Sequence, residues 1–160
     1  GIGVCYPIME RTQLILKLLY LQKGSRKPTD SENNDYTYYL LRLNYIEAPV
    51  LIRHSFNRRL YGEIGPSIAY LVKSSEQDEN GEIPYRRAFK KMDFSLNANL
   101  GFAFSTALDV RVSFWQSVLP VREHESGASY RLNHGQYNTV VALSLMMHIK
   151  PGQKEETKNP

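Results

Sequence analysis

The sequence predicts an all-β protein, an antiparallel up-and-down transmembrane β-barrel of about eight strands. Apolar and polar residues alternate with a period of two along most of the chain, the pattern of strands with two unlike faces. Short and long connections alternate between these stretches. No stretch approaches the roughly 18 apolar residues of a spanning helix. With 160 residues the chain fits one domain; we place the barrel at residues 1–149 and expect a disordered polar tail, 150–160, in the periplasm.

The alternation is clearest over residues 93–104. Every residue of one face is apolar, and every residue of the other is polar or small. The apolar face consists of Phe94, Leu96, Ala98, Leu100, Phe102 and Phe104, and the opposite face of Asp93, Ser95, Asn97, Asn99, Gly101 and Ala103. This stretch therefore predicts a strand between an apolar and a polar environment.

Six further stretches show the same pattern. They cover residues 2–8, 14–23, 44–56, 60–72, 108–118 and 137–149. Their apolar faces include Val110, Val112, Phe114, Val141, Leu143 and Leu145. The alternation is broken at Leu19, Leu21, Leu40, Leu41 and Leu43, where some apolar filling of a narrow interior is expected. Seven strands are thus visible.

The connections differ in length in a regular way. Short ones fall at 9–12, 56–59 and 105–108, and long polar ones at 24–35, 73–91 and 120–136. Transmembrane barrels have short periplasmic turns and long loops outside the cell. The last strand ends on the short-turn side, whereas seven strands put Gly1 on the long-loop side. An even count is typical of such barrels, so we expect a first strand upstream of Gly1.

Side-chain size indicates which face is turned inward. An eight-stranded barrel has an interior just wide enough for side chains, which suits the face of small and charged residues. We expect Lys17, Glu47, Arg53, Glu63, Asp93 and Arg111 to form an interior charge network, three cations against three carboxylates. The large apolar residues named above would then face lipid. The alternative is a soluble barrel or sandwich that buries its apolar face.

Other chemistry finds little support in the sequence. The net charge of +4 lies partly in loops without aromatic stacking residues, so we expect no nucleic-acid partner. Cys5 is the single cysteine. A metal site could use His124 and His134, but their spacing matches no compact ligand pattern. Ser113 or Ser144 with His148 and Asp93 lacks any nucleophile motif. We expect no cofactor, no metal and no enzyme activity, and His148 as an interior residue.

Three segments in order resemble a known family. Residues 18–24 (LLYLQKG), 44–53 (NYIEAPVLIR) and 61–72 (YGEIGPSIAYLV) look like successive motifs of the PorT-like outer-membrane β-barrel family of Bacteroidetes. The resemblance implies an eight-stranded barrel in the bacterial outer membrane, exported with a signal peptide. The chain departs from the family at Lys17, where a Glu is usual, in its missing first strand and in its polar tail.

We expect the protein to have a structural role or to interact with other proteins. Long loops surround an interior too crowded for a wide pore, which favours an accessory subunit of an envelope secretion or surface assembly. Outer-membrane lipid is the expected surrounding, with protein partners contacting loops 24–35, 73–91 and 120–136. The alternatives are a narrow ion or small-solute channel and a soluble small-ligand-binding β-barrel.

Overall fold

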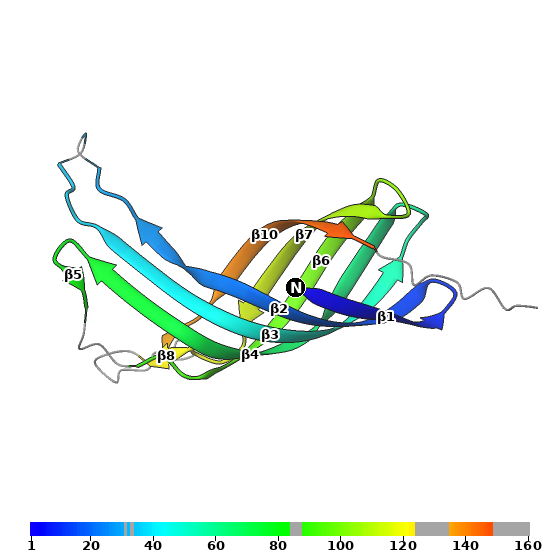
Figure 1. Ribbon diagram of the computed structural model, residues 1–160, viewed down its shortest axis with the longest axis horizontal. Coiled ribbons are helices and arrows are strands. Elements are labelled where there is room, and N and C mark those ends of the chain that lie inside the picture. The colour runs from blue at the N-terminus through cyan, green and yellow to red at the C-terminus, as the bar shows by residue number, and fades with distance from the viewer. Residues whose placement is uncertain (31, 33, 84–87, 124–134, 149–160) are drawn as a thin grey trace, which may run out of the picture.

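The computed structural model describes residues 1–30, 32, 34–83, 88–123 and 135–148, which form strands, turns and loops (Figure 1). None of these residues belongs to a helix long and apolar enough to cross a membrane. The strands are β1 (Ile2–Met9), β2 (Thr12–Lys27), β3 (Tyr39–Ser55), β4 (Leu60–Asp78), β5 (Gly81–Glu82), β6 (Met92–Ala103), β7 (Leu108–Ser117), β8 (Arg122–Glu123), β9 (Gly135–Gln136) and β10 (Thr139–Met147).

The long strands form one antiparallel sheet in the order β1-β2-β3-β4-β6-β7-β10, with β5 added to the end of β4. Each strand pairs with its sequence neighbour, apart from the short strands, and β8 and β9 form a separate two-stranded sheet. The main sheet curls into an open half-barrel (Figure 1). This confirms the predicted all-β, antiparallel, up-and-down fold.

The two faces of the sheet differ as the alternation predicted. Along β6, residues alternate strictly between exposed and buried. Leu96 is 56% exposed on the convex side, whereas Asn97 is 1% exposed on the concave side. Along β6 the small and polar side chains fit the concave side because curvature crowds it, and the large apolar side chains lie on the convex side, which is not crowded.

The convex side carries an apolar belt that continues around the sheet. One row runs across six strands at the same register, through Leu14, Ile52, Ile64, Ala98, Phe114 and Val141. Toward the long-loop end the last complete row of the belt is Tyr20, Ile46, Tyr70 and Met92. Beyond it follow Gln22, Asn44 and, after Val72 at a bulge, Lys73. Between Leu60 and Tyr70 on β4 it is about eleven residues high, the length of a tilted strand that crosses a bilayer.

The two ends of the half-barrel differ. At the short-turn end, residues 10–11, 56–59 and 104–107 connect neighbouring strands. At the long-loop end, β2, β3 and β4 continue beyond the belt as a paired wall. The predicted loops 24–35 and 73–91 therefore begin too early: residues 24–27 and 73–78 are strand. Cross-strand hydrogen bonds keep these polar residues extended although the alternation of apolar residues has ended.

A β-bulge between Asn44 and Tyr45 shifts the register opposite Val72 on β4. Before the bulge, odd-numbered residues of β4 face the concave side, as Leu71 does. After it, Ser74 pairs with inward-facing Leu43, and Glu76 is buried. The bulge therefore turns Glu76 into the interior, where simple alternation from residues 60–72 would have placed it outside.

The outer edges of the sheet, β1 and β10, do not pair with each other among the described residues. Both strands run toward the short-turn end, since β1 enters the turn at residues 10–11 and His148, just after β10, donates its backbone N–H to Ala107. A direct β1–β10 pair would be parallel.

The polar tail 150–160 and Ile149 lie outside the described residues, as do His124, His134 and parts of the predicted loops 73–91 and 120–136. Within the third loop the structure describes β8 and β9. Val121 at its start is 2% exposed and exchanges backbone hydrogen bonds with Lys90 and Gln136. This segment therefore packs onto the long-loop end of the barrel.

Candidate functional site: the barrel interior

The centre of the concave side is organised around one carboxylate, Glu63 on β4, which is 3% exposed. Three cations from three strands contact it. Lys17 Nζ lies 2.9 Å from Oε2, Arg53 Nε lies 2.9 Å from Oε1, and Arg111 Nη1 lies 3.2 Å from Oε2. Asn99 donates a further hydrogen bond to Oε2 at 3.0 Å. This central cluster carries two positive charges in excess.

A second cluster lies on the long-loop side of the first and has the opposite excess. Lys23 Nζ is 2.9 Å from Glu47 Oε2 and 3.1 Å from Asp93 Oδ2. The contact with Glu47 lacks hydrogen-bond geometry, so it is a charge contact only. Ser67 donates to Glu47 at 2.6 Å and Ser117 to Asp93 at 2.7 Å. One cation between two carboxylates leaves one negative charge.

Apolar side chains close the interior beyond this second cluster. The apolar plug consists of Leu43, Tyr45, Ala69 and Leu71, with Leu41 and Phe89 packed against them. Arg122 of β8 covers the plug: its guanidinium lies 4.5 Å from the centre of the Phe89 ring and donates to Glu76 Oε2 at 2.9 Å. The segment that carries Arg122 thereby packs against the plug at the long-loop end.

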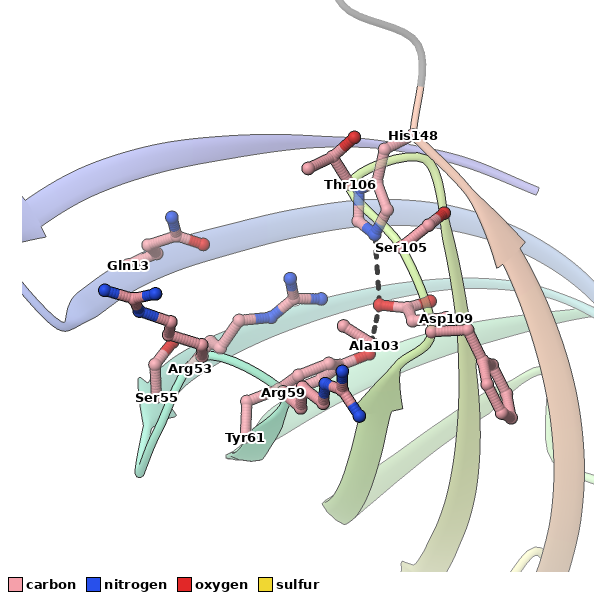
Figure 2. Close-up of a pocket in the computed structure, with 12 residues that line it drawn as sticks. Gln13, Arg53, Ser55, Arg59, Tyr61, Ala103, Ser105, Thr106, Asp109 and His148 are labelled. Carbon is pink, nitrogen blue, oxygen red and sulfur yellow. Dashed lines mark hydrogen bonds and ion pairs between the residues drawn. The ribbon is translucent and has the colours of Figure 1, made fainter.

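A third polar cluster lies at the short-turn end. Tyr61 OH donates to Asp109 Oδ2 at 2.6 Å, and His148 Nε2 lies 3.0 Å from the same oxygen. Figure 2 shows both side chains pointing at Asp109 inside a pocket of about 420 Å³. Tyr61 lies directly over Gly101 on the neighbouring strand, where a Cβ would be 2.0 Å from the Tyr61 ring. Glycine is therefore required there for the ring to lie flat.

The structure places all six residues of the predicted charge network on the concave side. Glu63 gathers Lys17, Arg53 and Arg111, whereas Glu47 and Asp93 lie apart in the second cluster. Sequence reasoning missed Lys23, Glu76, Asp109 and Arg122. With these four, the described interior holds five buried cations and five buried carboxylates. The total charge of these ten residues is zero, although the individual clusters are positive or negative. Neighbouring clusters therefore neutralise one another along the barrel axis.

The residues predicted to face lipid lie on the convex side or at its edge. They are Phe94, Leu96, Leu100, Phe102, Phe104, Val110, Val112, Phe114, Val141, Leu143 and Leu145; Val110 is half-buried and the others are exposed. Phe104 lies just past β6, in the turn that follows it. Three residues of the chain's last strand, Val141, Leu143 and Leu145, are at least 70% exposed. Such a surface is stable in hydrocarbon and unfavourable in water.

The structure does not bring together the serine, His148 and Asp93 that were considered as a nucleophilic site. His148 pairs with Asp109, and Asp93 accepts hydrogen bonds from Lys23, Ser117 and Asn138. Ser113 Oγ is buried. Among the described residues no group of His, Cys, Asp and Glu has the arrangement of a metal site. His124 and His134 lie outside those residues.

A curled antiparallel sheet with apolar side chains outside and paired charges inside defines a membrane-embedded β-barrel protein. The chain belongs to the outer membrane protein beta-barrel domain family, whose model matches residues 1–121. The protein is accordingly a bacterial outer-membrane barrel. Neither the curated proteins nor the solved structures gave a match. Since barrels of this class have short turns on the periplasmic side, the short-turn end faces the periplasm and the long-loop end faces the outside.

Proposed function

We propose that this barrel is a structural or protein-interaction subunit of a cell-envelope assembly, an accessory component of a secretion or surface machinery. The observation that supports this role is the filled outer half of the interior. Leu43, Tyr45 and Glu47 are each at most 1% exposed, and Phe89, with Arg122 over its ring, packs against the plug. A scaffold with a closed outer end and a rigid wall above the membrane suits contact with other proteins.

Two further statements belong to this proposal. The three motifs that resemble the PorT-like family of Bacteroidetes occur on the consecutive strands β2, β3 and β4, which supports membership of that branch. One additional strand, antiparallel to both β1 and β10, would close the barrel, because an open sheet edge in hydrocarbon leaves backbone groups without hydrogen bonds.

Cross-linking and affinity purification from outer-membrane extract test the interaction role. We expect reproducible partners, and we expect Arg42→Glu on the wall above the membrane to weaken their capture. Arg42 is exposed and faces outward. Arg11→Glu makes the same charge change in the turn at the opposite end and should leave capture unchanged. A barrel that is consistently purified alone would contradict the proposal.

A narrow ion or small-solute channel is the second candidate. The excess positive charge around Glu63 favours it, since a charged constriction selects ions. Planar bilayer recording would support a channel if Arg111→Ala or Glu63→Ala changed the conductance. Electrical silence of the native barrel would argue against it. The soluble ligand-binding barrel, the third candidate, is set aside by the exposed apolar belt and the family membership.

A further inference from the structure

The pocket at the short-turn end is lined by two exposed arginines, Arg58 and Arg59, that stand outside the charge balance of the buried clusters. Its lining includes Arg53, Arg58 and Arg59, against the single carboxylate of Asp109. Asp109 is already engaged by Tyr61 and His148 (Figure 2). Because Arg53 is paired with Glu63, Arg58 and Arg59 against Asp109 leave an excess of one positive charge. An anion is therefore the class of ligand that fits the pocket.

Two of the three arginines are available to a ligand. Arg53 donates to Glu63 and lies 4.0 Å from the centre of the Tyr61 ring. Arg58 and Arg59 are exposed, and neither forms an ion pair within the described part of the chain. The turn that carries them is fixed, because Asn57 Oδ1 accepts the backbone N–H groups of Arg59 and Leu60 at 2.8 Å each. Their backbone is thus positioned, while their guanidinium groups have no ion-pair partner among the described residues.

Hydroxyl groups complete the lining. Ser55, Ser105 and Thr106 contribute them, and Gln13 adds an amide. Ser105 Oγ accepts the backbone N–H of Ala107 at 3.2 Å and of Leu108 at 3.1 Å, so its own proton is free for an acceptor in the pocket. Arginine forks and hydroxyl donors together match a phosphate group, whose several oxygens accept charge-assisted hydrogen bonds.

The position of the pocket indicates where the phosphate comes from. Phe104 lines the pocket and is 63% exposed, and Phe56, which precedes Arg58 in its turn, is 53% exposed. Exposed aromatic rings at the end of an apolar belt mark the level of the lipid headgroups. We propose that the rim of the pocket, at Arg58 and Arg59, binds the phosphate group of a phospholipid in the periplasmic leaflet. The proposal rests on the orientation of the barrel and is independent of the partner role.

Isothermal titration calorimetry in dodecyl maltoside tests it, with the short-chain lipid dihexanoylphosphatidylglycerol as the probe. We expect the native barrel to bind this lipid and the Arg58→Gln/Arg59→Gln variant to bind it about tenfold more weakly. Arg11→Gln, which removes an exposed arginine from another turn at the same end, should bind as the native barrel does. Heat-modifiable migration in detergent gels checks that each variant is folded.

Two comparison ligands separate the sources of binding. Dihexanoylglycerol, which lacks the phosphate, should not bind; equal binding would overturn the proposal because apolar contact alone would explain it. Inorganic phosphate should compete weakly with the lipid. If phosphate bound as tightly as the lipid, the lipid source would be overturned. An equal loss of lipid binding in Arg11→Gln would also overturn the proposal, since general surface charge would then account for it.

Discussion

The two ends of this barrel differ in their chemistry. At the outer end, the apolar plug packs beneath the Arg122–Glu76 ion pair. At the periplasmic end, Tyr61, Asp109 and His148 form a polar cluster beside an open pocket. The Glu63 cluster lies between the two. A barrel interior is therefore not one uniform polar core: its outer end is packed with apolar side chains, and its periplasmic end is polar.

Removing the carboxylate between the two ends should have the largest effect. Glu63→Gln leaves three buried cations without their common partner, so we expect the free energy of unfolding to fall by about 3–5 kcal/mol. Urea titration in lipid vesicles, followed by Trp115 fluorescence, measures it. Glu79→Gln, an exposed change after β4, is the matched control.

The excess charge of that cluster predicts a second result. Lys17→Met should cost less than Glu63→Gln, because three cations share one carboxylate and removal of one relieves repulsion. The Glu63→Gln/Lys17→Met double variant should be less destabilised than the sum of the two single changes. If the losses of unfolding free energy in the two single variants simply added up in the double variant, Lys17 and Glu63 would not be coupled, which would contradict this prediction.

The outer plug should depend on packing. We expect Leu43→Ala to lower the free energy of unfolding by about 2–4 kcal/mol, because it leaves a cavity among fully buried side chains. Leu100→Ala on the lipid-facing side removes the same atoms, but lipid fills the space, so its cost should be smaller. If both variants lost the same free energy of unfolding in the urea titration, the plug would be no more closely packed than the lipid-facing surface.

Arg122 should control access from the outside. Arg122→Ala leaves the largely buried Glu76 without this partner, and we expect a loss of about 1.5–3 kcal/mol. The single tryptophan, Trp115, is 5% exposed and points inward. Its quenching by iodide should increase in Arg122→Ala and stay unchanged in Arg59→Ala at the periplasmic end. Equal quenching in the two variants would break the distinction between a closed and an open end.

The periplasmic cluster should depend on Gly101. Gly101→Ala places a methyl group against the Tyr61 ring and displaces its hydroxyl from Asp109, at a cost of about 1–3 kcal/mol. Adding Tyr61→Ala should remove most of the clash, so the double variant should be nearly as stable as Tyr61→Ala alone. Urea titration of the three variants measures their free energies of unfolding. If Gly101→Ala is as destabilising in the Tyr61→Ala background as in the native protein, the clash with the ring is not the cause.

The smallest effect is expected outside the barrel. Hydrogen bonds from Lys27 and Thr37 lower the pKa of Asp35 to about 2, against an ordinary value of 3.8. Lys27→Gln should raise this pKa toward the ordinary value, as measured by NMR titration of the carboxyl group. Because the pKa is depressed, the contact is fully formed above about pH 4 and is lost as the pH falls through about 2. Global stability at neutral pH should not change.

The alternation predicted the strands and their two faces because successive side chains of a strand point to opposite sides, so a period of two can be read from the sequence alone. Phe94 and Asp93 needed no structure to be assigned to opposite sides. The leucines that broke the pattern are equally informative: Leu43 faces inward and belongs to the apolar plug. What alternation alone left open, side-chain size decided, since only the small and charged face fits a narrow interior.

The clusters themselves could not be predicted, because they depend on register and on a bulge. Lys23 stood at the end of a predicted strand, and only its pairing with Leu43 places it beside Glu47 and Asp93. Glu76 fell in a predicted loop, and the bulge near Val72 turns it inward. Arg122 comes from a segment without periodicity. Local patterns do not encode contacts between strands that are 46 or 70 residues apart.

The wall that β2, β3 and β4 form above the membrane has a consequence for how its surface can vary. Gln22, Arg42 and Asn44 face outward, while their immediate neighbours Lys23 and Leu43 belong to the buried clusters. Substitutions that change what the cell presents to its surroundings are thus tolerated at every second position only. Among related barrels, we expect the amino-acid sequence of this wall to vary at the outward-facing positions and to be conserved at the inward-facing positions between them.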